Sequence, residues 1–150
     1  MLMFAIFWVF TLRVSAPCIN QPFYILKPEP IYVFNIRDPI LRAFVGFESF
    51  YNQYVVNPIS GARGILQFLP VMINEVNRIL LECDFNYSLY SWEDAFDVQK
   101  SIDMWYIVQR YHNPDYNIQK ACQIWFGIGV QYDGMTWVSY YKRIQKRLST

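Results

Sequence analysis

The sequence predicts a mainly α-helical domain over about residues 38–148, and three observations support this prediction. Apolar side chains recur at intervals of three and four residues in successive segments, which is the period of an α-helix. Residues that favour helix starts and ends flank these segments. Hydrophobic residues make up 54% of the 150-residue chain and charged residues 17%, so the chain has enough apolar surface to bury a core.

The first expected helix begins at Pro39, with Asp38 as its N-cap. Proline suits the first helical position because no amide hydrogen is needed there, and an aspartate side chain can accept hydrogen bonds from the first turn. The apolar stripe of this helix contains Leu41, Phe44 and Val45. The next position of the stripe, seven residues after Leu41, is Glu48. A carboxylate therefore stands where a core residue is expected.

Four further helices are expected after a loop over 52–60 and a glycine-bearing segment over 61–67. The residues that begin them are Pro70, Asp97, Asn117 and Thr136. A loop over 83–90 precedes the third helix, residues 112–115 end it, and Gly127 ends the fourth. The residues expected on the inner faces of these helices are Met72, Ile73, Val76, Ile79, Leu80, Val98, Ile102, Trp105, Tyr106, Gln109, Ile118, Ala121, Cys122, Trp125, Trp137, Tyr140, Tyr141, Ile144 and Leu148.

The chain before this domain is expected to contain an export signal over 1–16 and a proline-rich lead-in over 17–37, with a short strand over 31–34. Residues 2–12 are apolar apart from Thr11 and too short to span a bilayer comfortably. Ala16 supplies a small residue before a cleavage site. An uncleaved anchor is the alternative, because no Lys or Arg precedes the apolar run and Pro17 follows Ala16. We expect an exported protein of the periplasm or cell envelope.

Composition argues against several classes of function. A net charge of +1 argues against a nucleic-acid partner, because such proteins normally carry a strong basic excess. The three cysteines lack metal-ligand spacing and His112 is the single histidine, so we expect neither a metal site nor another cofactor. Four cations cluster near the end of the chain: Lys142, Arg143, Lys146 and Arg147. We interpret them as complementing a helix C-terminus, the alternative being attraction to an anionic polymer such as a bacterial wall.

Glu48 is the candidate for chemistry. Burial on an apolar stripe disfavours a carboxylate, which raises its pKa, so a glutamic acid there can donate a proton near neutral pH. Cleavage of a glycosidic bond needs such an acid at the leaving oxygen. A glutamate at a helix end that simply reaches solvent is the alternative. Asp94 and Asp97 are possible second carboxylates, but we interpret both as helix caps.

The neighbours of Glu48 carry a resemblance to a known family. The segments 47–50 (FESF), 57–60 (NPIS) and 61–67 (GARGILQ), followed by Pro70, resemble the pattern of SLT-type lytic transglycosylases and goose-type lysozymes. That pattern has a Glu-Ser pair closing a helix, an Asn-Pro loop and a Gly-Ala-x-Gly-Leu-Met-Gln segment. A weaker match to its Ala-Tyr-Asn-Ala-Gly element lies at 121–129 (ACQIWFGIG).

The resemblance implies a lysozyme-like α+β fold with a small β-hairpin region after the catalytic helix. It implies Glu48 as the catalytic acid, and the following substrate-binding residues: Ser49, Gly64, Gln67 and Trp125. Phe126 stands where the family usually has asparagine, so Gln123 or Tyr132 is expected to replace that contact. Trp125 also fits a packed core, since it shares a stripe with Ala121, but the family places its aromatic residue in the cleft.

The resemblance also implies the reaction and the partner. Glu48 would protonate the oxygen between N-acetylmuramic acid and N-acetylglucosamine in peptidoglycan glycan strands, and the acetamido group would replace a carboxylate nucleophile. Attack by the C6 hydroxyl gives a 1,6-anhydro end. A hydrolytic lysozyme, possibly carried in a phage virion, is one alternative. A non-catalytic peptidoglycan-binding or assembly module is another, and Phe126 favours it.

Overall fold

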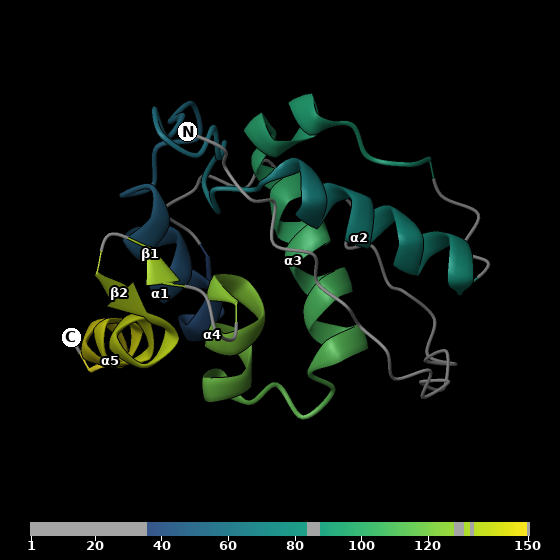
Figure 1. Cartoon of the computed structure of the whole chain (residues 1–150). Helices are drawn as coiled ribbons and strands as arrows, with labels where there is room; N and C mark the ends of the chain where they lie inside the picture. Colours follow the sequence, from purple (N-terminus) through teal and green to yellow (C-terminus); the bar gives the residue numbers. More distant parts are fainter. Residues whose placement is uncertain (1–35, 84–87, 128–130, 133, 150) are drawn as a thin grey trace.

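The computed structural model describes residues 36–83, 88–127, 131–132 and 134–149 (Figure 1). The expected export signal, the lead-in and the strand over 31–34 lie outside these residues. The elements are α1 (Pro39–Glu48), α2 (Pro70–Glu82), the short 3-10 helix η2 (Trp92–Phe96), α3 (Val98–His112), α4 (Ile118–Phe126), β1 (Gln131–Tyr132), β2 (Met135–Thr136) and α5 (Trp137–Leu148). The prediction of a mainly helical chain is confirmed.

The helix starts follow from the capping residues of the sequence. Asp38 Oδ1 accepts hydrogen bonds from the amides of Ile40 at 2.9 Å and Leu41 at 3.2 Å. Asp97, Asn117 and Thr136 cap α3, α4 and α5 in the same way. These bonds satisfy amides that have no partner within the helix, and they fix four of the α-helix starts near the predicted positions. α2 has no such cap and begins at Pro70, as predicted.

Three short elements were not predicted: η2, β1 and β2. The 3-10 helix η2 is held by a capping box, in which the amide of Ser91 donates to Asp94 Oδ2 at 2.7 Å. Asp94 therefore has the capping role that we expected. The strands β1 and β2 pair antiparallel, with Gln131 opposite Thr136. All three elements are too short to show a hydrophobic period in the sequence.

The small β-hairpin region expected after α1 takes the form of two isolated bridges. Arg63 pairs with Val56 on one side and with Phe68 on the other, both antiparallel. The intervening turn is fixed by Asn57, whose side-chain oxygen accepts from the amides of Ile59 and Ser60. The segment 55–68 is therefore a loop that is held by backbone bridges and by side chains of its own residues.

The helices pack in two groups that share an aromatic core. α1 and α4 lie against α5, while α2 lies beside α3 on the other side of the molecule (Figure 1). Between the groups, the Trp105 ring lies 4.5 Å from the ring centres of both Phe44 and Trp125. Aromatic rings bury large areas, so this cluster contributes much of the hydrophobic stabilisation.

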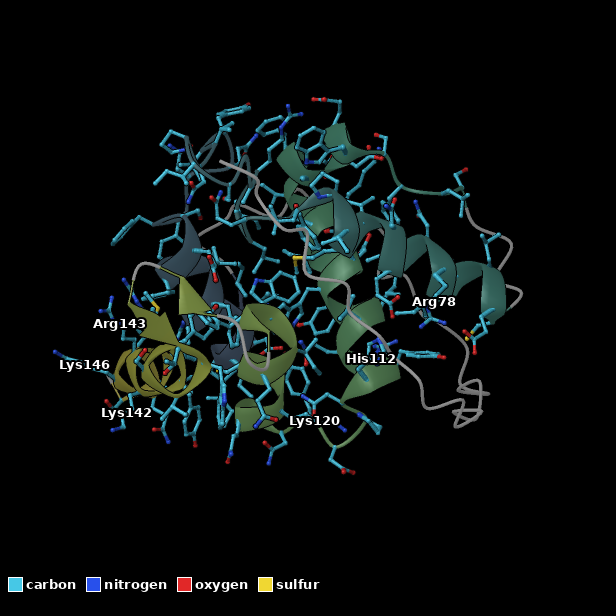
Figure 2. The ribbon with its side chains drawn as sticks, viewed as in Figure 1. Arg78, His112, Lys120, Lys142, Arg143 and Lys146 are labelled. Carbon is cyan, nitrogen blue, oxygen red and sulfur yellow. The ribbon has the colours of Figure 1, made fainter. Side chains whose placement is uncertain are left out.

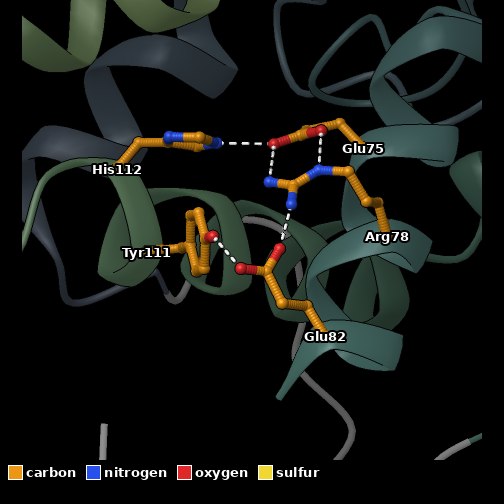
Figure 3. A network of polar contacts seen from close by, with 5 residues as sticks. All are labelled: Glu75, Arg78, Glu82, Tyr111 and His112. Carbon is orange, nitrogen blue, oxygen red and sulfur yellow. Dashed lines mark hydrogen bonds and ion pairs between the residues drawn. The ribbon is translucent and has the colours of Figure 1, made fainter. Parts of the chain in front are cut away.

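A polar network fastens α2 to the C-terminal end of α3 (Figure 3). Glu75 pairs with Arg78 Nε at 2.7 Å and with His112 Nε2 at 2.6 Å, while Glu82 pairs with Arg78 and accepts from the Tyr111 hydroxyl. Burial alone would raise the pKa of Glu75, but the bonds from Arg78 and His112 lower it to about 2. His112 therefore helps to hold the end of α3 against α2.

Within the part of the chain that the structure describes, no helix has the length and apolar character needed to cross a membrane.

Candidate functional site

Glu48 is the last residue of α1, at a point where the chain turns sharply. The side chains before it pack into the core, with Phe44 and Val45 fully buried. The two residues after the C-cap, Phe50 and Tyr51, both have left-handed backbone conformations, with φ of 51° and 65°. Non-glycine residues adopt such conformations at a cost, and they concentrate at functional sites. The turn leaves Glu48 partly exposed at the edge of the core.

Tyr140 on the inner face of α5 is the direct partner of Glu48. Its hydroxyl donates a hydrogen bond to Glu48 Oε1, and its side chain is only 2% exposed. The Tyr140 ring is held edge-on by Phe47 at 5.1 Å and lies 5.3 Å from the Phe126 ring. Packing of α5 on α1 therefore fixes one carboxylate oxygen, while Oε2 has no hydrogen-bond partner among the described residues.

This environment brings the pKa of the Glu48 carboxyl group into the neutral range. Burial raises the pKa of the carboxyl group, the bond from Tyr140 lowers it, and the net value is about 7. Burial and the charge of Glu48 raise the pKa of the Tyr140 hydroxyl well above its usual value and that of the Cys122 thiol to about 12. Of these three groups, Glu48 is the one that exchanges a proton near pH 7.

Two residues expected to bind substrate, Ser49 and Gln67, are engaged by backbone. The Ser49 hydroxyl is buried and donates to the carbonyl of Val45 at 3.1 Å. The Gln67 amide donates to the carbonyls of Gly64 at 2.9 Å and Val55 at 3.3 Å. Gln67 therefore helps to hold the 55–68 loop together.

Gly64 lies in a turn and also packs closely against the backbone of η2. Its φ is +76°, and a Cβ atom built there would lie 1.7 Å from the carbonyl oxygen of Ala95 in η2. Arg63 reinforces the same contact, because its guanidinium lies 3.7 Å from the ring centre of Trp92 and pairs with Glu93 at 2.6 Å. The glycine-bearing segment is thus fastened to η2, an element that the sequence did not predict.

The ring of Trp125 lies in the core, not at the mouth of a cleft as we expected. It is 8% exposed, its indole nitrogen donates to the carbonyl of Leu66 at 3.2 Å, and its ring lies 5.1 Å from that of Phe68. The apolar stripe of α4 decides its position. Gln123 is half-buried on the same helix, and Tyr132 lies in β1 opposite Met135.

Replacing Trp125 by phenylalanine is expected to lower the free energy of unfolding by about 1–3 kcal/mol, because a core ring loses volume and a buried hydrogen bond. Turnover by the folded fraction should stay normal. Thermal melting followed by activity measured well below the melting temperature tests both parts. Normal stability together with weak activity would instead indicate that Trp125 binds substrate.

Comparison of the chain with protein-family models, curated protein sequences and solved structures finds no match in any of the three.

Proposed function

We propose that the chain is a peptidoglycan lytic transglycosylase with a lysozyme-like fold, in which Glu48 is the general acid and then the general base. The observation that carries this proposal is Glu48, a partly exposed residue at the end of α1 whose desolvated carboxyl group has a pKa of about 7 and accepts a hydrogen bond from Tyr140. The Glu-Ser pair and the glycine-bearing segment that follow one another in the sequence also support it.

The first step would be proton donation by Glu48 to the oxygen that bridges N-acetylmuramic acid and N-acetylglucosamine. The bond from that oxygen to the muramic acid C1 breaks, and the acetamido oxygen of the same sugar stabilises the electron-poor carbon. A pKa of about 7 leaves close to half of the carboxyl groups protonated at neutral pH. Since Tyr140 holds Oε1, we propose that the proton is donated from Oε2, which has no hydrogen-bond partner among the described residues.

In the second step the Glu48 carboxylate would take the proton of the muramic acid C6 hydroxyl as that oxygen bonds to C1. This closes a 1,6-anhydro ring and restores the protonated acid. Substrate assistance removes the need for a carboxylate nucleophile. Consistent with this, Asp94 and Asp97, the second carboxylates considered above, are engaged as helix caps and by Lys100.

The products of purified peptidoglycan separate this proposal from its rivals. Mass spectrometry should find 1,6-anhydro-muramic acid ends that depend on the presence of the protein. Reducing ends in their place would mean that water attacks C1, so that the chain is a hydrolytic lysozyme. Binding without any product would mean a non-catalytic wall-binding module. Phe126 favours that alternative, and its ring centre lies 5.3 Å from that of Tyr140.

Replacing Tyr140 by phenylalanine is expected to move the alkaline limb of the pH–rate profile upward by about one pH unit. The hydroxyl stabilises the charged form of Glu48, so its loss raises the pKa of the carboxyl group above about 7. The half-buried neighbour Tyr141 provides the control, because its hydroxyl bonds to Gln145. An unmoved limb in Tyr140→Phe, or an equal shift in Tyr141→Phe, would contradict the role of Tyr140.

A further inference from the structure

The outer face of α5 carries an excess of positive charge. Its four cations are Lys142, Arg143, Lys146 and Arg147, and this helix contains no acidic residue. The rest of the chain has nine Lys and Arg against 12 Asp and Glu, so charge is strongly concentrated here. Such asymmetry is a signal for an anionic partner even where net charge is near zero.

Three of these cations point away from the body of the protein. Lys142, Arg143 and Lys146 are exposed and spread outward from α5 (Figure 2). None of the three forms an ion pair with a described residue. Their charges are therefore available to a partner. Since Tyr140 and Ile144 occupy the buried face of the same helix, this surface is distinct from the Glu48 site.

Exposed apolar side chains lie among the cations. Val138 is 42% exposed and precedes Lys142 and Lys146 at intervals of four residues, which places all three on one stripe of α5. Near the other end of the helix, the Arg147 guanidinium lies 5.4 Å from the ring centre of Phe50, which is 77% exposed. Positive charges alone would be enough to bind a soluble polyanion, whereas apolar side chains contribute to binding only where they are removed from water.

We infer that the outer face of α5, with Val138 and Phe50, docks on a lipid bilayer that contains anionic headgroups. Lysine and arginine side chains bind headgroup phosphates while neighbouring apolar groups enter the interface, as in surface-lying amphipathic helices. The apolar run over residues 2–12, which we expect to be an export signal or an anchor, also favours a bilayer as the partner. This inference does not rest on the proposed function of Glu48.

The test measures binding of the full chain to vesicles of phosphatidylcholine alone and to vesicles with equal parts of phosphatidylglycerol. The apolar run of the N-terminus can bind both, so neutral vesicles give the baseline. Anionic vesicles should bind at least about tenfold more tightly at low salt, and the double variant Lys142→Gln/Lys146→Gln should lose about tenfold. Thermal melts establish that the variants are folded.

A matched control removes the same charge elsewhere. Arg37 and Lys120 are exposed and form no ion pair with a described residue, so Arg37→Gln/Lys120→Gln should bind anionic vesicles as the wild type does. Figure 2 shows Lys120 away from the three α5 cations. Equal binding to both kinds of vesicle, or an equal loss in the control, would overturn the inference.

A third variant separates a bilayer from a soluble polyanion. Val138→Ser leaves all charges in place, so it should weaken binding to anionic vesicles and leave binding to inorganic polyphosphate unchanged. If Val138→Ser and wild type bind the vesicles equally, and polyphosphate displaces both, then α5 is a polyanion site and the bilayer is the wrong partner.

Discussion

Glu48→Gln is expected to lower the rate of peptidoglycan cleavage by about 10²–10⁴-fold, the usual contribution of general acid–base catalysis. Glutamine keeps the size of the side chain and an oxygen that can accept the bond from Tyr140, but it has no proton to donate. Quantitative product release by purified wild type and variant provides the measurement. Activity within a few-fold of wild type would remove Glu48 from the mechanism.

The same substitution is expected to make the protein more stable at alkaline pH, which distinguishes a loss of chemistry from a loss of fold. The folded-state pKa of about 7 lies above the ordinary 4.5, so the stability that the protonated Glu48 contributes is complete below pH 4.5 and is lost as the pH rises through 7. At pH 8 the wild type bears the cost of a buried carboxylate and the glutamine variant does not. Because Glu48 is partly exposed, we expect a gain of about 2 kcal/mol.

Melting temperatures at pH 4.5 and pH 8 test this part. The variant should resemble the wild type at pH 4.5 and exceed it at pH 8. Asp115→Asn serves as the control, since Asp115 is exposed in the turn after α3 and removing its charge should produce no such pH-dependent gain. A variant that gains nothing at pH 8 would mean that the Glu48 carboxyl group is not desolvated.

The first helix illustrates what a single sequence can predict. Asp38 and Pro39 gave the start of α1, and Glu48 was identified because a carboxylate interrupts an apolar stripe. These are local signals. The tertiary partners of the same helix left no local signal, although they hold it in place: the hydroxyls of Tyr106 and Tyr116 both donate to Asp38 Oδ2. The helical period of α3 indicates that Tyr106 faces inward, but not which carboxylate it meets, and Tyr116 lies between α3 and α4, where no such period applies.

The candidate site was predictable to the same degree. Glu48 was identified as a candidate from its own position, whereas Tyr140 was assigned only to an inner helix face, because 92 residues separate the two partners. Trp125 was misplaced for a related reason: its apolar stripe indicated the core correctly, and the family resemblance outweighed it. The 3-10 helix η2 was missed, and with it the physical reason for Gly64, since the contact with Ala95 depends on that helix.

Gly64 and Gly61 form a matched pair that tests this reason. Both have left-handed backbones, with φ of +76° and +74°, so alanine is conformationally strained at either position. They differ in their surroundings. A Cβ atom on Gly64 would lie 1.7 Å from the carbonyl oxygen of Ala95, whereas one on Gly61 would have no atom within 4 Å. Any difference between the two alanine variants therefore measures the close approach of the 61–67 segment to η2.

Gly64→Ala is expected to lower the free energy of unfolding by about 3 kcal/mol or more, since the overlap with backbone adds to the strain of a positive φ. Gly61→Ala should cost about 1 kcal/mol, from the backbone conformation alone. In a domain of this size the two losses correspond to melting temperatures lower by about 10 °C and about 3–5 °C. Because η2 must move away from the loop in Gly64→Ala, hydrogen exchange in residues 92–96 should accelerate in that variant and not in the other. Equal losses in the two variants would mean that the contact between Gly64 and Ala95 does not stabilise the fold.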